Sequence, residues 1–336
     1  MRYLVVLVLI FCAAAAAAQP WEDRRRFGPE AGDGPVLRIL SSTDTAFFEP
    51  ILARFLSERP GVAIDYFVTG TADVDRRFRA DPGAYDLVIS SAMDLQLKLA
   101  NDGFALPLAE IAHPAWAQWR QSLFAFTTEP AAIVVNRTAF AKGAVPKTRQ
   151  ALIEVLRAEP ERFRDRIGTY DVRESGLGYL FATQDARVTE TYWRLTEVMG
   201  ALGTRLYCCS GEMIDDLSDG TILVAYNVLG SYAAARADTT DDLQIVLPSD
   251  FPTTMMRTAF VSERTEHGNL AAAFVRHLLE REPEDASDES YPLPALAPVA
   301  DGQSAIVLGP ALITYLDALK RRTFLREWED AIIQRP

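Results

Sequence analysis

The sequence predicts an α/β protein that folds as two domains. Segments with the short apolar pattern of strands alternate with segments of helical spacing, which is typical of sheets whose strands run mainly parallel. The chain has 336 residues, more than the roughly 100–200 of an average domain. Because 49% of the residues are hydrophobic, burial can offset the entropy lost on ordering, and general disorder is excluded.

The first 18 residues have the organisation of a cleavable secretory signal peptide. A positive start at Arg2 precedes an apolar run at 4–11, and small residues lead up to Ala18. The run is shorter than the roughly 18 uninterrupted apolar residues of a transmembrane span, so a retained anchor is the less favoured alternative. We expect residues 1–18 to be removed near Ala18 and the mature chain to be exported.

The first domain is expected to be a sheet whose strands are connected by helices. Strands are predicted at 36–40, 62–68 and 85–89. Between the first two strands, Phe48, Ile51 and Phe55 recur at helical spacing, and the helix ends before Pro60. Another helix begins near Asp94. Strands alternating with helices imply parallel pairing with right-handed crossovers.

A second domain follows in the same style. Further strands are predicted at 133–135, 222–226, 243–247 and 258–261, and long helices at 270–279 and 310–333. The strand 258–261 is expected to return to the first sheet. The last helix carries an apolar stripe that includes Phe324 and Trp328, which favours packing against a domain over a groove for a partner. The acidic segment 280–290 is expected to be a solvated loop.

The charge balance restricts the possible partners. Lysine and arginine total 34 against 46 acidic residues, so the formal net charge is −12. Nucleic-acid binders need a basic face, and this composition therefore argues against nucleic acid as a partner. A local positive pocket for a small anion remains compatible with it.

Polar residues gather where predicted strands end and helices begin. The members of these clusters, in chain order, are Ser41, Ser42, Thr43 and Asp44; Ser90 and Ser91; Asp171, Ser175, Gly176 and Leu177; and Tyr226, Asn227 and Ser231. In open α/β sheets ligands bind at these strand ends, beside unpaired N–H groups. Any one cluster is more typical of a helix cap or turn. Their recurrence favours a single ligand-binding site.

With these residues in this order, the chain resembles the extracellular solute-binding proteins of ABC importers, in the group that takes up iron(III) or phosphorylated metabolites. The segments that carry the similarity are 37–48, 85–91, 171–179, 226–233, 246–248 and 257–261. The resemblance implies the type II periplasmic binding protein fold. In that fold two lobes, each a mixed, mainly parallel sheet flanked by helices, close on a ligand in the cleft between them. Lobe 1 would comprise 36–130 and 258–336, and lobe 2 would comprise 131–257.

The iron ligands of this group are missing. Iron-binding members use two adjacent tyrosines, a histidine and a glutamate, but no tyrosine pair follows Asn227, and Asp44 and Ser91 stand where histidine and glutamate would be. One carboxylate cannot replace four ligands, so no metal is expected, with Asp44 in an altered ferric site as the alternative. Ser175–Leu177 and Asn227 match oxyanion-binding positions. The resemblance therefore implies a small anionic organic solute, phosphorylated or carboxylated.

A secreted enzyme is the competing class. The three histidines, His113, His267 and His277, belong to no G-x-S-x-G, H-x-x-x-H or C-x-x-C context. We therefore expect no catalytic residue and no cofactor.

Two adjacent cysteines, Cys208 and Cys209, remain after removal of the leader. Neighbouring residues cannot form a relaxed disulfide, because the Cα separation that it requires exceeds one peptide unit. A strained vicinal ring, a soft-metal site with Met213, and a pair of buried small side chains are the open alternatives. The last of these is favoured.

The resemblance also implies the surroundings of the protein. We expect a monomer in the periplasm that delivers its solute to the permease subunits of an ABC importer. The alternative is a ligand-presenting partner of a membrane sensor kinase. Both roles use the same cleft and the same closure.

Overall fold

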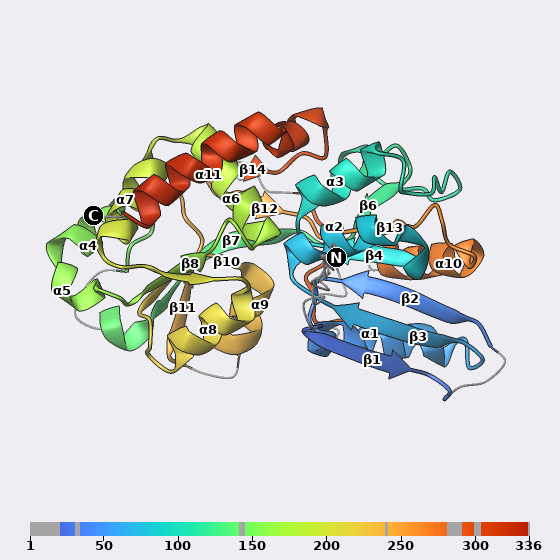
Figure 1. The fold of residues 1–336 in the computed structure, drawn as a ribbon. Helices are drawn as coiled ribbons and strands as arrows, with labels where there is room; N and C mark the ends of the chain where they lie inside the picture. Colours follow the sequence, from blue (N-terminus) through green and yellow to red (C-terminus); the bar gives the residue numbers. More distant parts are fainter. Residues whose placement is uncertain are drawn as a thin grey trace, which may run out of the picture.

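The computed structural model describes residues 21–30, 34–140, 145–238, 241–280, 291–298 and 304–334. Two seven-stranded sheets with flanking helices lie side by side (Figure 1). The predicted signal peptide and nearly all of the predicted acidic loop lie outside the described residues. Within these ranges, no helix is both long and apolar enough to cross a membrane.

The first sheet is mixed, with a parallel centre. Its order is β1 (Asp23–Phe27), β3 (Ala63–Val68), β2 (Val36–Ser41), β4 (Leu87–Ser90), β13 (Thr258–Val261), β6 (Leu123–Ala125) and β5 (Gln118–Trp119). Strand β2 pairs in parallel with β3 and β4, whereas β1 and β13 are antiparallel to their neighbours. The three predicted strands and the predicted return strand 258–261 are confirmed.

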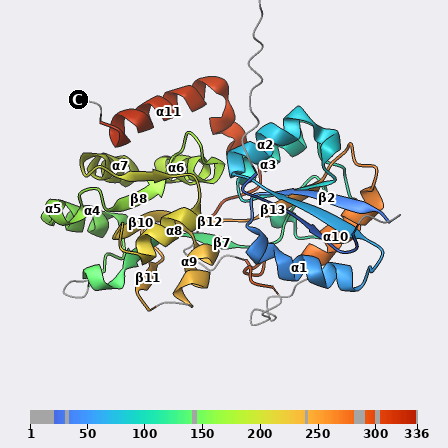
Figure 2. The same cartoon turned by 60° about the horizontal axis from the view of Figure 1, so that its bottom comes forward.

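Four α-helices flank this sheet: α1 (Thr45–Ser57), α2 (Thr71–Ala80), α3 (Met93–Asn101) and α10 (Gly268–Leu279). Helix α1 buries Phe48, Ile51 and Phe55, which the helical period places on one face. Burying each such side chain contributes roughly 1.5–3 kcal/mol. Figure 2 shows α1 and α10 on the side of the sheet opposite to α2 and α3. The helices hold the strand ends of β2 and β4 in a fixed position.

The second sheet is also mixed. Its order is β14 (Ser304–Ala305), β12 (Thr253–Met255), β7 (Glu129–Asn136), β10 (Val224–Leu229), β8 (Ile167–Tyr170) and β9 (Arg205–Tyr207), with β11 (Leu243–Val246) paired to β7. Its helices are α4 (Arg149–Ala158), α5 (Pro160–Phe163), α6 (Gly176–Val188), α7 (Thr191–Ala201), α8 (Ser210–Ser218) and α9 (Gly230–Ala237). Strands β8, β9 and β10 are parallel, so their carboxyl ends meet at one edge.

The C-terminal helix packs on the second sheet and not on the first, whereas the short helical segment before it packs against α3. The helix predicted at 310–333 is divided at Asp317 into a 3₁₀ helix (Pro310–Leu316) and α11 (Ala318–Ile332). Helix α11 lies along α7 (Figures 1 and 2) and buries Phe324 and Trp328 in the core of the second sheet. A Cβ on Gly200 of α7 would lie 2.3 Å from the carbonyl oxygen of Ala331, so the helices can approach this closely only at a glycine. The sequence analysis had placed 318–332 in lobe 1, because an apolar stripe does not say which surface it covers.

Two of the connections between the sheets lie at 126–128, from β6 to β7, and at 256–257, from β12 to β13. The two crossing segments are hydrogen-bonded to each other. The N–H of Phe126 donates to the carbonyl of Arg257 at 3.0 Å, and the N–H of Arg257 donates to the Thr127 hydroxyl at 3.0 Å. A paired connection of this kind keeps the two sheets adjacent and can bend without losing its hydrogen bonds.

Candidate functional site

A cavity of about 200 Å³ lies between the two sheets. From the first sheet side it is lined by Glu22, Ser42, Asp44, Thr69, Gly70, Thr71 and Ser91. From the second sheet side it is lined by Tyr170, Ser175, Leu177, Cys208, Cys209, Ser210, Gly211, Glu212, Asp215, Leu229 and Tyr232, with Arg257 at the crossing. Of the predicted site residues, the structure brings Ser42, Asp44, Ser91, Ser175 and Leu177 to this cavity.

The amino ends of five helices converge on the cavity. The residues that cap α1, α2, α6, α8 and α9 all line it: Asp44, Gly70, Ser175, Cys209 and Leu229. The first N–H groups of a helix have no partner within it, and the helix dipole places about half a positive charge at this end. The helix ends therefore contribute positive potential to the part of the cavity that they face, although the chain as a whole is acidic.

The serines after β2 and β4 form a connected set. The Ser42 hydroxyl donates to that of Ser90 at 3.3 Å and accepts from the N–H of Ser91 at 3.3 Å. Ser90 is buried, and its hydroxyl also accepts from the N–H of Ala92. Ser42 and Ser91 reach the cavity, whereas Ser90 supports them from below.

Ser41 and Thr43 are also buried supports. The Ser41 hydroxyl accepts from the N–H of Thr43 at 3.0 Å and from the Tyr66 hydroxyl at 2.8 Å. The Thr43 hydroxyl accepts from Arg257 at 2.6 Å. These bonds fix the turn that carries Ser42 and Asp44, and neither side chain lines the cavity.

The segment before α6 meets the first sheet side directly. Ser175 caps α6 by accepting from the N–H of Gly178 at 3.1 Å. The N–H of Leu177 donates to the Thr71 hydroxyl of α2 at 3.0 Å. A Cβ on Gly176 would lie 2.9 Å from Leu95 of α3. The two sides of the cavity are therefore in contact at this edge.

A second contact between the sides involves Tyr232. Its hydroxyl accepts from the N–H of Asp44 at 3.3 Å, and its ring packs on Phe47 with centroids 4.6 Å apart. Burial raises the pKa of Tyr232 well above its usual value, and the charge of Asp44 adds to this. The phenol is neutral at physiological pH.

Tyr226 and Asn227 of the predicted site lie away from the cavity, in a network around Asp185. The Tyr226 hydroxyl donates to Asp185 at 2.8 Å and the Asn227 amide donates to it at 3.0 Å. The pairing of β10 with β7 shifts register between Ala225 and Val228, and Asn227 has a φ of 63°. This bulge turns the amide into the interior. The local sequence contains no pattern that predicts the bulge.

Asp171 and Ser231 are likewise engaged elsewhere. Asp171 binds Arg173 through two hydrogen bonds, at 2.8 and 2.6 Å, beside the amino end of α6. The same pair neutralises Arg173. Ser231 donates to Glu129. None of these side chains lines the cavity.

Arg257 is a lining residue that the sequence reasoning missed. Its side chain is fully buried, with Nε 3.1 Å and Nη2 3.2 Å from the carboxylate oxygens of Glu129. Burial alone would lower the pKa of Arg257, but the charge of Glu129, its hydrogen bonds and smaller contributions together raise that pKa above its usual value. The available signal was an arginine directly before the mainly apolar return strand 258–261, where a buried cation needs a partner.

Carboxylates on both sides of the cavity add hydrogen-bond acceptors to the donors at the helix ends. Loss of hydration, with the charges of Asp44, Asp73 and Glu212, raises the pKa of Glu22 to about 7. Burial also raises the pKa of Asp44, against the opposing effects of Tyr232 and Arg257. These groups accept hydrogen bonds when ionised, and Glu22 can also donate one near neutral pH.

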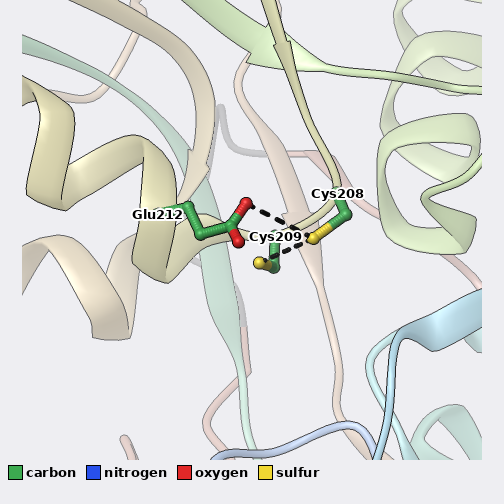
Figure 3. A group of neighbouring side chains, drawn as sticks. All are labelled: Cys208, Cys209 and Glu212. Atoms are coloured by element: carbon green, nitrogen blue, oxygen red, sulfur yellow. Dashed lines mark hydrogen bonds between the residues drawn. The ribbon is translucent and has the colours of Figure 1, made fainter. Parts of the chain in front are cut away.

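The cysteine pair also lines the cavity. Figure 3 shows the two cysteines beside Glu212. The Sγ of Cys208 lies 2.9 Å from that of Cys209 and 3.6 Å from a carboxylate oxygen of Glu212. Cys208 is exposed and Cys209 half-buried, so the favoured interpretation as buried small side chains is wrong. Met213 is buried in the core and does not join the pair.

The histidines lie outside this site. His113 contacts the carbonyl of Ala125 through Nε2, and His277 contacts that of Ile51. Burial lowers the pKa of both rings. His267 precedes α10. The cavity itself is lined by hydroxyls, carboxylates and thiols, and by no histidine of the described residues.

Two α/β sheets around a polar cavity define the class of the protein: a two-lobed binding protein. Residues 41–201 match the model of a family described as bacterial extracellular solute-binding protein. The fold is similar to the crystal structure of the substrate-binding protein of an ABC transporter from Agrobacterium tumefaciens. That similarity has 31% identity, a TM-score of 0.87, and coverage of 93% of this chain and 99% of that one. The chain therefore belongs to the bacterial extracellular solute-binding proteins of ABC transporters.

More distant structures share the fold. The periplasmic binding protein AfuA from Actinobacillus pleuropneumoniae, with exogenous fructose 6-phosphate bound, has a TM-score of 0.71 at 14% identity, covering 89% of this chain and 98% of that one. Iron-bound HitA from Pseudomonas aeruginosa has a TM-score of 0.63 at 13% identity, covering 88% and 99%. No curated protein sequence matches the chain.

Proposed function

We propose that this protein captures a small organic solute with an anionic group, phosphate or carboxylate, and delivers it to the permease of an ABC importer without chemical change. The observation that carries this proposal is the convergence of the amino ends of five helices on one cavity. Backbone N–H groups at helix ends bind oxyanions by hydrogen bonding and by the helix dipole together. The fructose 6-phosphate bound to AfuA gives the same chemistry a precedent in this fold.

The carboxylates suggest what the rest of the solute carries. Glu22, Asp44 and Glu212 line the same cavity as the helix ends. Carboxylates are acceptors, so they favour donor groups such as the hydroxyls of a sugar or polyol. They also oppose a second negative charge on the solute. A monophosphorylated sugar or a hydroxy acid has both groups: an anionic group for the helix ends and hydroxyl donors for the carboxylates.

We infer that closure of the two lobes around the crossing segments encloses the solute. The bonds from Leu177 to Thr71 and from Asp44 to Tyr232 join the two sides of the cavity. A ligand that touches both sides stabilises this arrangement over an open one by its differential affinity. The permease then recognises the closed form. Residues 1–18 would direct the chain to the periplasm, where it would act as a monomer.

The alternative of a ferric-ion carrier has less support. A tyrosinate ligand requires a phenol that loses its proton. The two cavity tyrosines are instead hydrogen-bonded, Tyr170 to Ser210 and Tyr232 to the N–H of Asp44. Burial raises the pKa of both phenols. Among the described residues, the cavity carboxylates of Glu22, Asp44, Glu212 and Asp215 also form no group of three that is close enough to share one trivalent ion.

A thermal-shift screen of the chain from Gln19 onward tests the proposal. The matched set is glucose 6-phosphate, glucose, glycerate, citrate and inorganic phosphate, with ferric citrate included. A solute at about 100 times its dissociation constant stabilises the folded state by about 2.7 kcal/mol. We expect a shift with phosphorylated or carboxylated polyols and none with glucose. A shift with glucose alone, or with ferric ion but not with citrate, would contradict the anionic solute.

Two serine variants then test the site. Ser42→Ala removes a cavity hydroxyl, and Ser57→Ala removes one on α1 whose bond is to the carbonyl of Arg54, away from the cavity. Loss of one hydrogen bond to an anionic group costs roughly 1.5–3 kcal/mol. Ser42→Ala should weaken solute binding by that amount in calorimetry, with Ser57→Ala unchanged. Equal affinities in both variants would place the solute elsewhere.

A further inference from the structure

The cysteine pair and a neighbouring carboxylate form a group of ligand atoms that the proposed function leaves unused. The Sγ atoms of Cys208 and Cys209 and the carboxylate of Glu212 all lie within 4.8 Å of one another (Figure 3). Cys209 is the capping residue of α8, and Glu212 lies in the first turn of that helix. One helix end therefore presents all three atoms to the cavity.

We propose that Cys208, Cys209 and Glu212 hold a thiophilic divalent cation of the zinc class in the wall of the solute cavity. Thiolate and carboxylate are both ligands of Zn²⁺, which takes four ligands at 2.0–2.3 Å in a tetrahedral arrangement. The Sγ-to-carboxylate distance of 3.6 Å already suits two ligands of one such ion. The Sγ atoms, at 2.9 Å, have to separate, which a rotation about χ1 of the exposed Cys208 provides.

The charges around the cluster favour a cation. The described lining of the cavity contains Glu22, Asp44, Glu212 and Asp215 against a single arginine, Arg257. That arginine is already neutralised by Glu129. Glu22 belongs to the facing side of the cavity, so it can supply a fourth ligand when the lobes are closed. Water, or the anionic group of a bound solute, can take this position instead of Glu22.

The chemistry of the pair selects the ion. Thiolate ligands favour Zn²⁺ over Mg²⁺, Ca²⁺ and Mn²⁺, which prefer all-oxygen sites. The pair displaces its protons when it binds, so affinity should increase with pH. A bound cation would also offset the repulsion among the carboxylates and hold the anionic group of the solute directly. A role of the cation in transport rests on the proposed function. The cation site itself does not, because metal binding can be measured without any solute.

Zinc titration of the reduced mature protein against a competing chromophoric chelator tests the site. We expect one Zn²⁺ per chain, and a Co²⁺-loaded protein with a thiolate-to-metal charge-transfer band. Loss even of an outer partner of a metal ligand costs roughly 10–100-fold in affinity, so Cys208→Ser/Cys209→Ser should lose at least that factor. Glu212→Gln should lose less. Mg²⁺ should compete with neither ion.

Asp215→Asn is the matched control, because Asp215 lines the cavity on the same helix but pairs with Arg236. It should bind Zn²⁺ as the native chain does, and circular dichroism should show all variants folded. Equal Zn²⁺ affinity in the native chain and the double serine variant would overturn the proposal. So would reduced native protein that binds no Zn²⁺, an outcome that would leave the strained vicinal ring as the role of the pair. Solute binding in the screen above is unaffected by either failure.

Discussion

Two arginine side chains are fully buried and paired with carboxylates, but they connect different parts of the fold. Arg149 on α4 binds Asp185 at 2.9 Å and the Tyr226 hydroxyl at 2.7 Å, all within the second sheet and its helices. Arg257 lies between the sheets, bound to Glu129 of β7 and to Thr43 of the turn before α1. Similar chemistry therefore serves one lobe in the first case and both lobes in the second.

The comparison separates stability from function. A buried ion pair contributes little net stability against an apolar replacement, but leaving one partner alone is costly. Both arginines should therefore matter equally to folding. Only Arg257 lines the cavity and supports the turn that carries Ser42 and Asp44, so only Arg257 should also matter to the solute.

The largest effect is expected for Arg257→Met. The charge of Glu129 would remain buried without its partner, and the free energy of unfolding should fall by roughly 3–5 kcal/mol. Solute affinity should also fall, because the turn before α1 loses its anchor. Urea unfolding and calorimetry measure the two quantities.

The double variant Arg257→Met/Glu129→Gln controls for the stranded charge. It should recover much of the stability and none of the affinity. If the affinity returned together with the stability, Arg257 would act on the fold alone, and the contrast with Arg149 would disappear.

Arg149→Met should be as destabilising, by roughly 3–5 kcal/mol, because Asp185 loses its counter-charge in the core. In protein that remains folded, calorimetry should show unchanged solute affinity. Arg164→Met, which removes an exposed pair with Glu161, should leave urea unfolding unchanged. Weaker binding by folded Arg149→Met would show that the network around Asp185 reaches the cavity.

These two networks also show how far the sequence can be read. The strands β2, β3 and β4 and the caps Asp44 and Ser175 are local: apolar period and cap residues lie within a few positions of each other. Sequence reasoning therefore found them, together with the lining residues Ser42 and Ser91. The pairing of Arg257 with Glu129 spans 128 positions, and no local pattern reports it. The bulge that buries Asn227, and the choice of α7 as the surface for α11, depend in the same way on shapes that form only in the folded chain.

A third buried ionisable group differs from the two arginine networks, because its hydrogen bond comes from the backbone and no arginine in the described part of the chain pairs with it. Asp94 on α3 accepts from the N–H of Leu95, and burial raises its pKa from 3.8 to about 7. The folded chain then keeps a proton that the unfolded chain loses near pH 4. Stability should therefore fall as pH rises from 4 to 7, by roughly 3 kcal/mol.

Asp94→Asn should flatten this dependence in urea unfolding at pH 5 and pH 8. Glu22, whose pKa is raised to about 7 in the same direction, contributes to the remaining slope. Asp94→Asn/Glu22→Gln should therefore be flatter still. A native chain that is more stable at pH 8 than at pH 5 would exclude both groups as the main titrating residues.

The smallest effect tests the contact between the lobes. Thr71→Ala removes the hydroxyl that accepts from the N–H of Leu177 across the cavity edge. Only the closed arrangement contains this bond, so its loss should raise the dissociation constant of the solute by a free energy of about 0.5–1.5 kcal/mol. Unfolding of the free protein should change little.

Thr148→Ala is the matched control, since Thr148 accepts from the N–H of Ala151 at the start of α4, within one lobe. That variant should lose about 1 kcal/mol of stability as a helix cap and none of its affinity. The two threonines thus repeat, at the scale of one hydrogen bond, the difference between Arg257 and Arg149. Equal loss of affinity in both variants would mean that binding responds to lobe stability in general and not to contacts across the cleft.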